Sequence, residues 1–220
     1  MKKHKVALLG ATGAVGREMM KILAERSFPV EELHLLASER SAGQKIQWQG
    51  QELTVEPACD EAFRGLDIVL GAAENDIAKR FAPAIVKAGA VFVDNSSAFR
   101  LDPDVPLVIP EINPEDAKKH KGIIANPNCT TMAAMPALKV LHEEAGLIRL
   151  IVSTYQAASG AGMPGLTELE REMACVASGD PVGQTKPFQH QLAVNLIPQI
   201  GGFNEVGYTS EEMKMQNEGR

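Results

Sequence analysis

The sequence predicts an α/β fold whose N-terminal part is built on a parallel β-sheet. Three observations support this prediction: short apolar runs recur through the first half of the chain, helical patterns separate them, and a glycine-rich turn follows the first run. Strands that alternate with helices are typical of parallel sheets with right-handed crossovers. With 45% hydrophobic residues in a chain of 220, there is enough apolar material for a core.

The strands are predicted from apolar, β-branched runs bounded by glycine, proline or polar residues. In chain order they are 6–9, 33–37, a hairpin of 46–48 and 53–55, then 67–73, 91–93 and 123–124. A helix entered near Ala14 is predicted, because the apolar residues Val15, Met19, Ile22 and Leu23 recur on one helical face. The segment 78–88 also has a helical composition, although Pro83 leaves its start open.

A second domain is predicted to begin after Pro127, so that 1–127 and 128–220 are separate domains. The chain stops in a charged helical run with no recognisable cap, so the second domain is expected to be incomplete. Its predicted elements are a helix over 132–145, a long strand over 147–156, a glycine-rich loop over 157–165, and helices over 166–177 and 211–218.

Composition excludes several classes of protein. The three cysteines are odd in number and far apart, so we expect no disulfide framework, no metal site and a reducing, cytoplasmic setting. No apolar stretch approaches the ~18 residues of a membrane span, and the start of the chain lacks the apolar core of a signal peptide. The net charge of −6, with both signs interspersed, argues against a nucleic-acid partner.

The glycine turn Gly10-Ala-Thr-Gly13-Ala-Val-Gly16 lies between a predicted strand and a predicted helix. In that context glycine spacing indicates a Rossmann-like dinucleotide site, with the pyrophosphate on the helix N-terminus near Ala14. The spacing is a variant of the usual pattern. A turn that binds nothing is the alternative.

The end of the second predicted strand indicates which dinucleotide is bound. An NAD site usually has an acidic residue there, whereas this chain has Ser38, Glu39, Arg40 and Ser41. An arginine between hydroxyls suits a 2′-phosphate, so NADP is predicted as the cofactor. Glu39 is the residue that favours NAD instead.

Cys129 lies where an apolar strand breaks at Asn126-Pro127 and a helical segment begins. Helix N-termini favour thiolate over thiol, and their N–H groups stabilise an oxyanion on a carbonyl attacked by the sulfur. The position therefore indicates covalent chemistry at a carbonyl carbon. A buried structural cysteine is the alternative.

Several ordered motifs together resemble the aspartate-semialdehyde dehydrogenases. They are the glycine turn, Asp94-Asn-Ser-Ser-Ala-Phe-Arg100, Asn126-Pro-Asn-Cys-Thr-Thr131, Ser153-Thr-Tyr-Gln-Ala-Ala-Ser-Gly-Ala-Gly162 and Glu211-Glu-Met-Lys-Met215. The resemblance spans the whole chain and favours a catalytic over a structural cysteine.

The resemblance implies a phosphorylating aldehyde dehydrogenase that interconverts L-aspartate 4-semialdehyde and 4-phospho-L-aspartate through a Cys129 thioester, in lysine, methionine and threonine biosynthesis. It implies that 128–220 are the first part of an α+β domain for catalysis and dimerisation. It also implies a homodimer or homotetramer and assigns roles to individual residues. Gln156 orients the substrate and Asn128 flanks the sulfur. Arg100 and Lys214 hold phosphate or the substrate carboxylate, and Glu211 lies near the substrate amino group. The cofactor is contacted by Thr12, Gly13, Ala14, Val15, Arg40, Ser41, Ser159 and Gly160.

Without the resemblance, these side chains have ordinary interpretations. Arg100 is then a solvated loop arginine, Gln156 a structural amide, and Lys214 with Glu211 a surface ion pair three residues apart on one helical face.

The family also needs a general base and a second substrate arginine, which are expected beyond residue 220. Among the histidines present, His190 is the least implausible base. We therefore expect little turnover from this chain alone, because loss of a general base costs ~10²–10⁴-fold in rate. The alternatives are an N-acetyl-γ-glutamyl-phosphate reductase and an inactive nucleotide-binding fragment.

Overall fold

The structure is a computed structural model that describes residues 2–219. It consists of two compact units. The first contains the chain as far as Ile148 together with Glu218 and Gly219, and the second is Arg149–Asn217.

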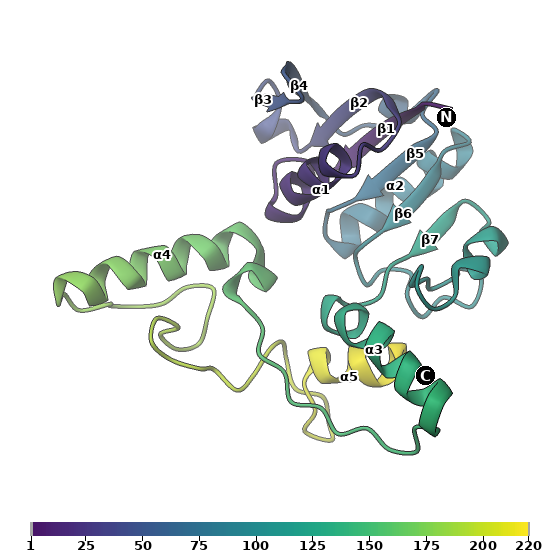
Figure 1. Cartoon of the computed structure of the whole chain (residues 1–220). Helices are drawn as coiled ribbons and strands as arrows, with labels where there is room; N and C mark the ends of the chain where they lie inside the picture. Colours follow the sequence, from purple (N-terminus) through teal and green to yellow (C-terminus); the bar gives the residue numbers. More distant parts are fainter. Residues whose placement is uncertain (1, 220) are drawn as a thin grey trace. The chain divides into compact units, whose positions relative to one another are not determined.

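A seven-stranded sheet forms the centre of the first unit, in the order β3-β4-β2-β1-β5-β6-β7 (Figure 1). Its strands are β1 (His4–Leu9), β2 (Val30–Ala37), β3 (Lys45–Trp48), β4 (Gln51–Pro57), β5 (Ile68–Gly71), β6 (Val91–Asp94) and β7 (Ile123–Ala125). Every neighbouring pair is parallel except the β3–β4 hairpin. The predicted α/β class and parallel sheet are confirmed.

Two helices cover the two faces of this sheet because successive side chains of a strand point to opposite sides. Leu9 and alternate strand residues pack with the apolar face of α2 (Asn75–Lys87). Leu8 and the strand residues that point to the same side as Leu8 pack with α1 (Ala14–Glu25). Both leucines are almost fully buried, which stabilises the fold by about 1.5–3 kcal/mol each.

The first unit also contains α3 (Cys129–Ala145), which begins three residues before the predicted start at Met132. Short 3₁₀ helices connect the strands. They are η1 (Glu39–Ser41), η2 (Asp60–Phe63) and η3 (Pro114–Lys119).

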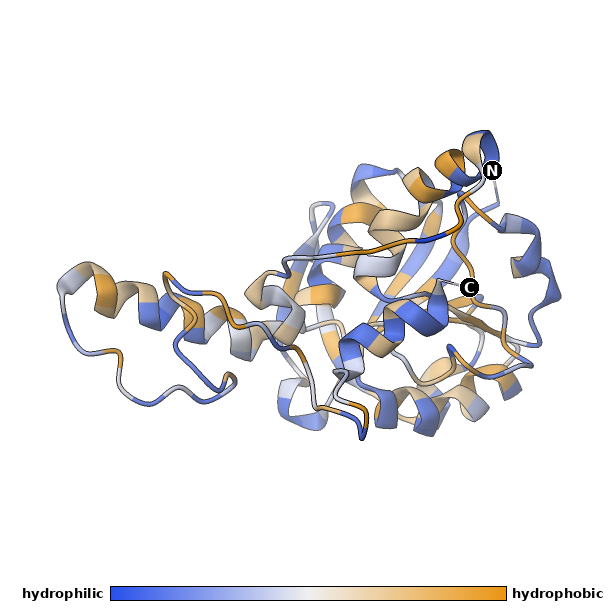
Figure 2. Cartoon of the chain, turned by 90° about the horizontal axis from the view of Figure 1, so that it is seen from below, coloured by the Kyte–Doolittle hydropathy of each residue, from blue (hydrophilic) through white to orange (hydrophobic). Residues whose placement is uncertain are grey.

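The second unit contains η4 (Ala158–Ala161), α4 (Gly162–Ser178) and all but the last residue of α5 (Ser210–Glu218). Figure 2 shows hydrophobic and hydrophilic residues interspersed along α4. The predicted glycine loop over 157–165 is wrong, because the chain is helical from Ala158 onward, first in η4 and then in α4. No helix among residues 2–219 is long and apolar enough to cross a lipid bilayer.

The predicted strand over 147–156 is wrong. These residues form no strand in the described structure, although their β-branched composition favours one. Ile151 is 79% exposed and Tyr155 84% exposed. A strand is held by hydrogen bonds to a neighbouring strand, and none of the described residues supplies one to this segment.

Candidate active site

Three segments that carry predicted site residues of the first unit leave the sheet at one edge. Gly10, Asn95 and Asn126 each follow the carboxyl end of a parallel strand, namely β1, β6 and β7. This is the edge at which open α/β sheets bind ligands. The sequence predicted Gly10, Arg100 and Cys129 as site residues, and the parallel strands bring the segments that carry them to one edge.

The glycine turn follows β1 in a conformation that requires glycine. Gly10 has φ +93°, and a Cβ there would lie 2.6 Å from the carbonyl oxygen of Ala72. A Cβ at Gly16 would lie 2.4 Å from the Gly10 carbonyl oxygen, because the first turn of α1 packs directly on the loop. These two glycines therefore set the backbone path, as the spacing predicted.

The start of α1 suits a phosphate. Gly13 is its N-cap and supplies no side-chain acceptor, and the first turn carries no acidic residue. The backbone N–H groups near Ala14 and Val15 are therefore not capped by a side chain, and the positive end of the helix dipole lies beside them. A Cβ at Gly13 would meet the protein only at 3.4 Å, so packing within the protein does not require glycine there.

The segment after β2 begins at Ser38, which is the N-cap of η1. Arg40 within η1 is exposed and forms no ion pair with any described residue, whereas Ser41 is partly buried. The Arg40 guanidinium is therefore available to a ligand.

Cys129 is the first residue of α3 and is exposed. Asn128 caps this helix: its side-chain oxygen accepts a hydrogen bond from the Thr130 N–H at 2.9 Å. The prediction that Cys129 lies at the start of a helix is confirmed. The alternative of a buried structural cysteine does not fit an exposed thiol.

Arg100 is not the solvated loop arginine of the ordinary interpretation. Its side chain is only 7% exposed. Nη2 donates to the Asn95 carbonyl oxygen at 2.8 Å, and Nη1 lies 3.0 Å from Oε1 of Glu218. The guanidinium is thus held at the carboxyl edge of the sheet, and Nε is buried with no hydrogen-bond partner.

Asp94 ends β6 beside this arginine and is fully buried. Burial raises the pKa of its carboxyl group, although hydrogen bonds from Ser96 and the charge of Arg100 act in the opposite direction. The Ser96 hydroxyl donates to Oδ2 at 2.6 Å and the Ser96 N–H to Oδ1 at 3.0 Å. The acid therefore shapes the turn that leads to Arg100.

The remaining predicted residues lie in the second unit. Gln156 packs on Gly160, where a Cβ would lie 2.0 Å from the glutamine Nε2, and Oε1 of Gln156 is buried with no partner. Ser159 is exposed beside them. Lys214 Nζ donates to Oε2 of Glu211 at 2.7 Å on one face of α5, as their spacing predicted.

Glu218 is a candidate that the sequence did not reveal. Its side chain is 2% exposed and contacts both Arg100 and Asn128. In the sequence it is one acid in a charged run, separated from Arg100 by 118 residues. No local pattern connects these two residues.

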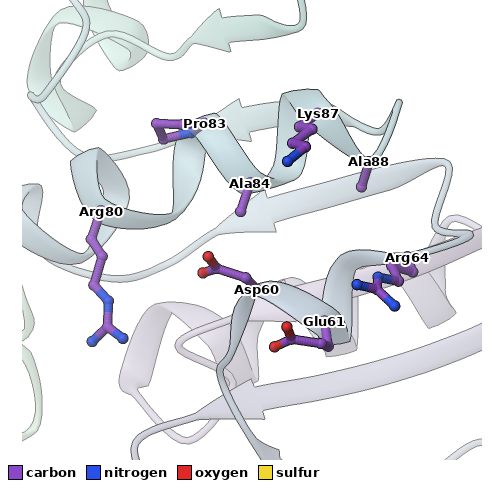
Figure 3. Close-up of a pocket in the computed structure, with 8 residues that line it drawn as sticks. All are labelled: Asp60, Glu61, Arg64, Arg80, Pro83, Ala84, Lys87 and Ala88. Atoms are coloured by element: carbon purple, nitrogen blue, oxygen red, sulfur yellow. The ribbon is translucent and has the colours of Figure 1, made fainter.

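A separate hollow lies between η2 and α2 (Figure 3). It contains acids from η2, Asp60 and Glu61, and bases that include Arg80 and Lys87. None of its lining residues was predicted for the site. Across residues 2–219, no three metal-ligating side chains come together.

Two protein-domain families match the chain. The family described as "Semialdehyde dehydrogenase, NAD binding domain" matches residues 5–120, and the one described as "Semialdehyde dehydrogenase, dimerisation domain" matches residues 138–220. The predicted boundary at 127 falls between these two ranges.

Curated relatives cover almost all of the chain. The aspartate-semialdehyde dehydrogenase of Aquifex aeolicus is 50% identical over 99% of this chain, and that of Bacillus subtilis is 47% identical over 97%. The chain spans 65% and 63% of the length of these relatives.

Solved structures share the fold. Aspartate semialdehyde dehydrogenase II of Vibrio cholerae, complexed with ASA, has a TM-score of 0.96 at 43% identity and covers 100% of this chain, which in turn covers 66% of it. The Candida albicans enzyme with NADP has a TM-score of 0.54 at 29% identity, over 67% of this chain and 49% of that one.

Proposed function

Because the chain belongs to the aspartate-semialdehyde dehydrogenase family, we propose that it carries the nucleophile and the cofactor site of a phosphorylating dehydrogenase for L-aspartate 4-semialdehyde. The observation that carries the proposal is an exposed Cys129 at the start of α3, on the sheet edge that also holds the glycine turn. The alternative function, N-acetyl-γ-glutamyl-phosphate reductase, is not favoured, because both curated relatives above are aspartate-semialdehyde dehydrogenases by name.

The dinucleotide site fits NADP. Gly10, Gly13 and Gly16 shape a phosphate-binding turn, and the exposed Arg40 follows β2, where the ribose 2′-position is bound in this fold. When bound, the nicotinamide supplies the hydride acceptor. Thr12, Ala14, Val15, Ser41, Ser159 and Gly160 are proposed as further contacts.

Cys129 is proposed to act first. Its sulfur attacks the aldehyde carbon, and the resulting oxyanion lies beside N–H groups at the start of α3. Loss of hydride from that carbon leaves a thioester. Gln156 is proposed to orient the substrate, and Glu211 to lie beside the substrate amino group.

Phosphate is proposed to complete the reaction. One of its oxygens attacks the thioester carbon, the acyl phosphate forms, and the Cys129 thiolate leaves. Arg100 and Lys214 are the proposed anion ligands, since a guanidinium and an ammonium both suit phosphate. The reverse reaction is the biosynthetic direction, and the match to a dimerisation domain supports self-association of the whole protein.

Purified chain mixed with aspartate semialdehyde, phosphate and NADP⁺ tests the proposal. We expect NADPH to form at a low rate that depends on Cys129. Cys129→Ser should abolish it, whereas Cys59→Ser should leave it unchanged because that thiol, also exposed, lies before η2. Iodoacetamide should modify Cys129, because its thiol is exposed at the start of α3.

Two results would contradict the proposal. Equal NADPH formation in the wild type and in Cys129→Ser would exclude Cys129 as the nucleophile. A faster reaction with N-acetylglutamate semialdehyde than with aspartate semialdehyde would favour the alternative reductase. Binding of NADP⁺ with no Cys129-dependent reduction would support the inactive nucleotide-binding fragment.

A further inference from the structure

The carboxylate of Glu218 has both oxygens engaged by the candidate site. Oε1 lies 3.0 Å from Nη1 of Arg100, and Oε2 accepts a hydrogen bond from the backbone N–H of Asn128. All three residues belong to the first unit. One side chain therefore joins the predicted anion-binding arginine to the residue that immediately precedes Cys129.

Glu218 and Arg100 are both buried, and this burial restricts where the Glu218 carboxylate can lie. The Glu218 side chain is 2% exposed and that of Arg100 is 7% exposed. A buried carboxylate is tolerated only where a cation and hydrogen-bond donors compensate its charge, and here Arg100 and the Asn128 N–H do so. The two partners approach different oxygens, so a shift of the carboxylate toward one partner weakens its contact with the other.

The orientation of Arg100 leaves one of its three guanidinium nitrogens without a hydrogen bond. Nη1 faces Glu218 and Nη2 donates to the Asn95 carbonyl oxygen, whereas Nε is buried with no partner in the described structure. A buried unpaired N–H is costly, so in a native structure it calls for an explanation, and a catalytic role or a bound ion is one of them. The guanidinium is thus held by its Nη groups, while Nε has no partner among the described residues.

We propose that Glu218 is a positioning residue that holds Arg100 against the start of α3, so that its free donor meets an anion bound beside Cys129. This inference rests on the proposed function, in which Arg100 binds phosphate. Glu218 itself contacts no substrate: it acts through Arg100 and through the backbone of Asn128.

The test measures how inorganic phosphate protects Cys129 from iodoacetamide, with modification of each cysteine quantified by mass spectrometry. Phosphate should slow modification of Cys129 and not of Cys59, which is the internal reference. In Glu218→Gln the amide offers one acceptor for two donors, so the half-protective phosphate concentration should rise at least about tenfold, the loss expected for one hydrogen bond to a charged group.

Glu218→Asp separates geometry from charge. It keeps the carboxylate but shortens the side chain by one methylene, so it cannot reach both partners, and it should also weaken protection. Glu205→Gln makes the same change as Glu218→Gln at an exposed position and should leave protection unchanged. A urea curve for each variant confirms that it is folded under the assay conditions, so that a loss of protection does not reflect unfolding.

Three outcomes decide the inference. Weaker protection in both Glu218 variants supports it. Unchanged or stronger protection overturns it, since stronger protection would mean that Glu218 competes with phosphate for Arg100. Absence of protection in the wild type also overturns it, while Cys129-dependent NADPH formation, measured separately, still decides the proposed function.

Discussion

The side-chain amide of Asn126 donates a hydrogen bond to Oδ1 of Asn95 at 2.7 Å, which joins the ends of β6 and β7. Asn95 in turn donates from Nδ2 to the Gly71 carbonyl oxygen at 2.8 Å, at the end of β5. Three strand ends are thus linked through two amides. The loops that lead to Arg100 and Cys129 leave the sheet from this linked edge.

Replacing Asn95 by alanine should loosen this edge. The change removes the donor to Gly71 and the acceptor for Asn126, so the free energy of unfolding should fall by about 1–3 kcal/mol. Urea denaturation measures the change. Asn75→Ala is the control, because its hydrogen bonds to Ser97 are exposed and its loss should cost about 0.5 kcal/mol or less. Equal losses in the two variants would argue against the link.

Alanine at two positions of the glycine turn should separate folding from binding. Gly16→Ala places a Cβ 2.4 Å from the Gly10 carbonyl oxygen, so it should lower the free energy of unfolding by about 2–3 kcal/mol. Gly13→Ala meets the protein only at 3.4 Å and should change stability by less than about 1 kcal/mol. It should nevertheless weaken NADP⁺ binding at least about tenfold in calorimetry. Full binding by Gly13→Ala would place the pyrophosphate elsewhere.

Arg40→Ala should weaken the binding of NADP⁺ far more than that of NAD⁺, because only NADP⁺ carries the 2′-phosphate that this exposed guanidinium would contact. Fluorescence or calorimetric titration with both dinucleotides measures the ratio. Arg64→Ala, at the hollow beside η2, should affect neither. Equal losses for the two dinucleotides at Arg40 would contradict the NADP assignment.

Asp94 should make the free energy of unfolding depend on pH in a defined direction. Its pKa is raised in the folded state by burial, so the folded protein binds the proton more tightly than the unfolded chain does. The contribution of Asp94 to stability is therefore more favourable below its unfolded pKa and declines as pH rises through the raised folded value.

Asp94→Asn removes this titration. Urea denaturation across the mildly acidic range should show the wild type losing stability relative to Asp94→Asn as pH rises. Asp102→Asn, at an exposed position, serves as the control. A difference between wild type and Asp94→Asn that is constant with pH would mean that burial does not raise this pKa.

The segment 149–156 should promote self-association, because exposed contiguous apolar surface favours contact between molecules. Ile151 is 79% exposed, so Ile151→Lys should reduce the fraction of associated protein in sedimentation velocity. Leu101→Lys removes a comparably exposed apolar side chain, 69% exposed, outside this segment and should have little effect. No change with Ile151→Lys would exclude this residue from the contact.

The sequence by itself determined the local elements of the first unit and the place of its reactive groups. Apolar runs bounded by turn residues predict β1 and β5, and the strand–glycine–helix order predicts the dinucleotide turn, because these patterns depend on neighbouring residues alone. The break at Pro127 likewise placed Cys129 at a helix start, which the cap by Asn128 confirms.

Only the tertiary structure decided which of these features become a site. The sequence predicted a strand over 147–156 that does not form, because a strand depends on a partner that composition does not reveal. It also left Arg100 as a possible surface side chain and Glu218 unremarked. Burial, and a carboxylate 118 residues away, hold Arg100 beside the start of α3. A contact of that sequence separation arises from tertiary packing, here between the end of α5 and the segment after β6, and no local pattern encodes it.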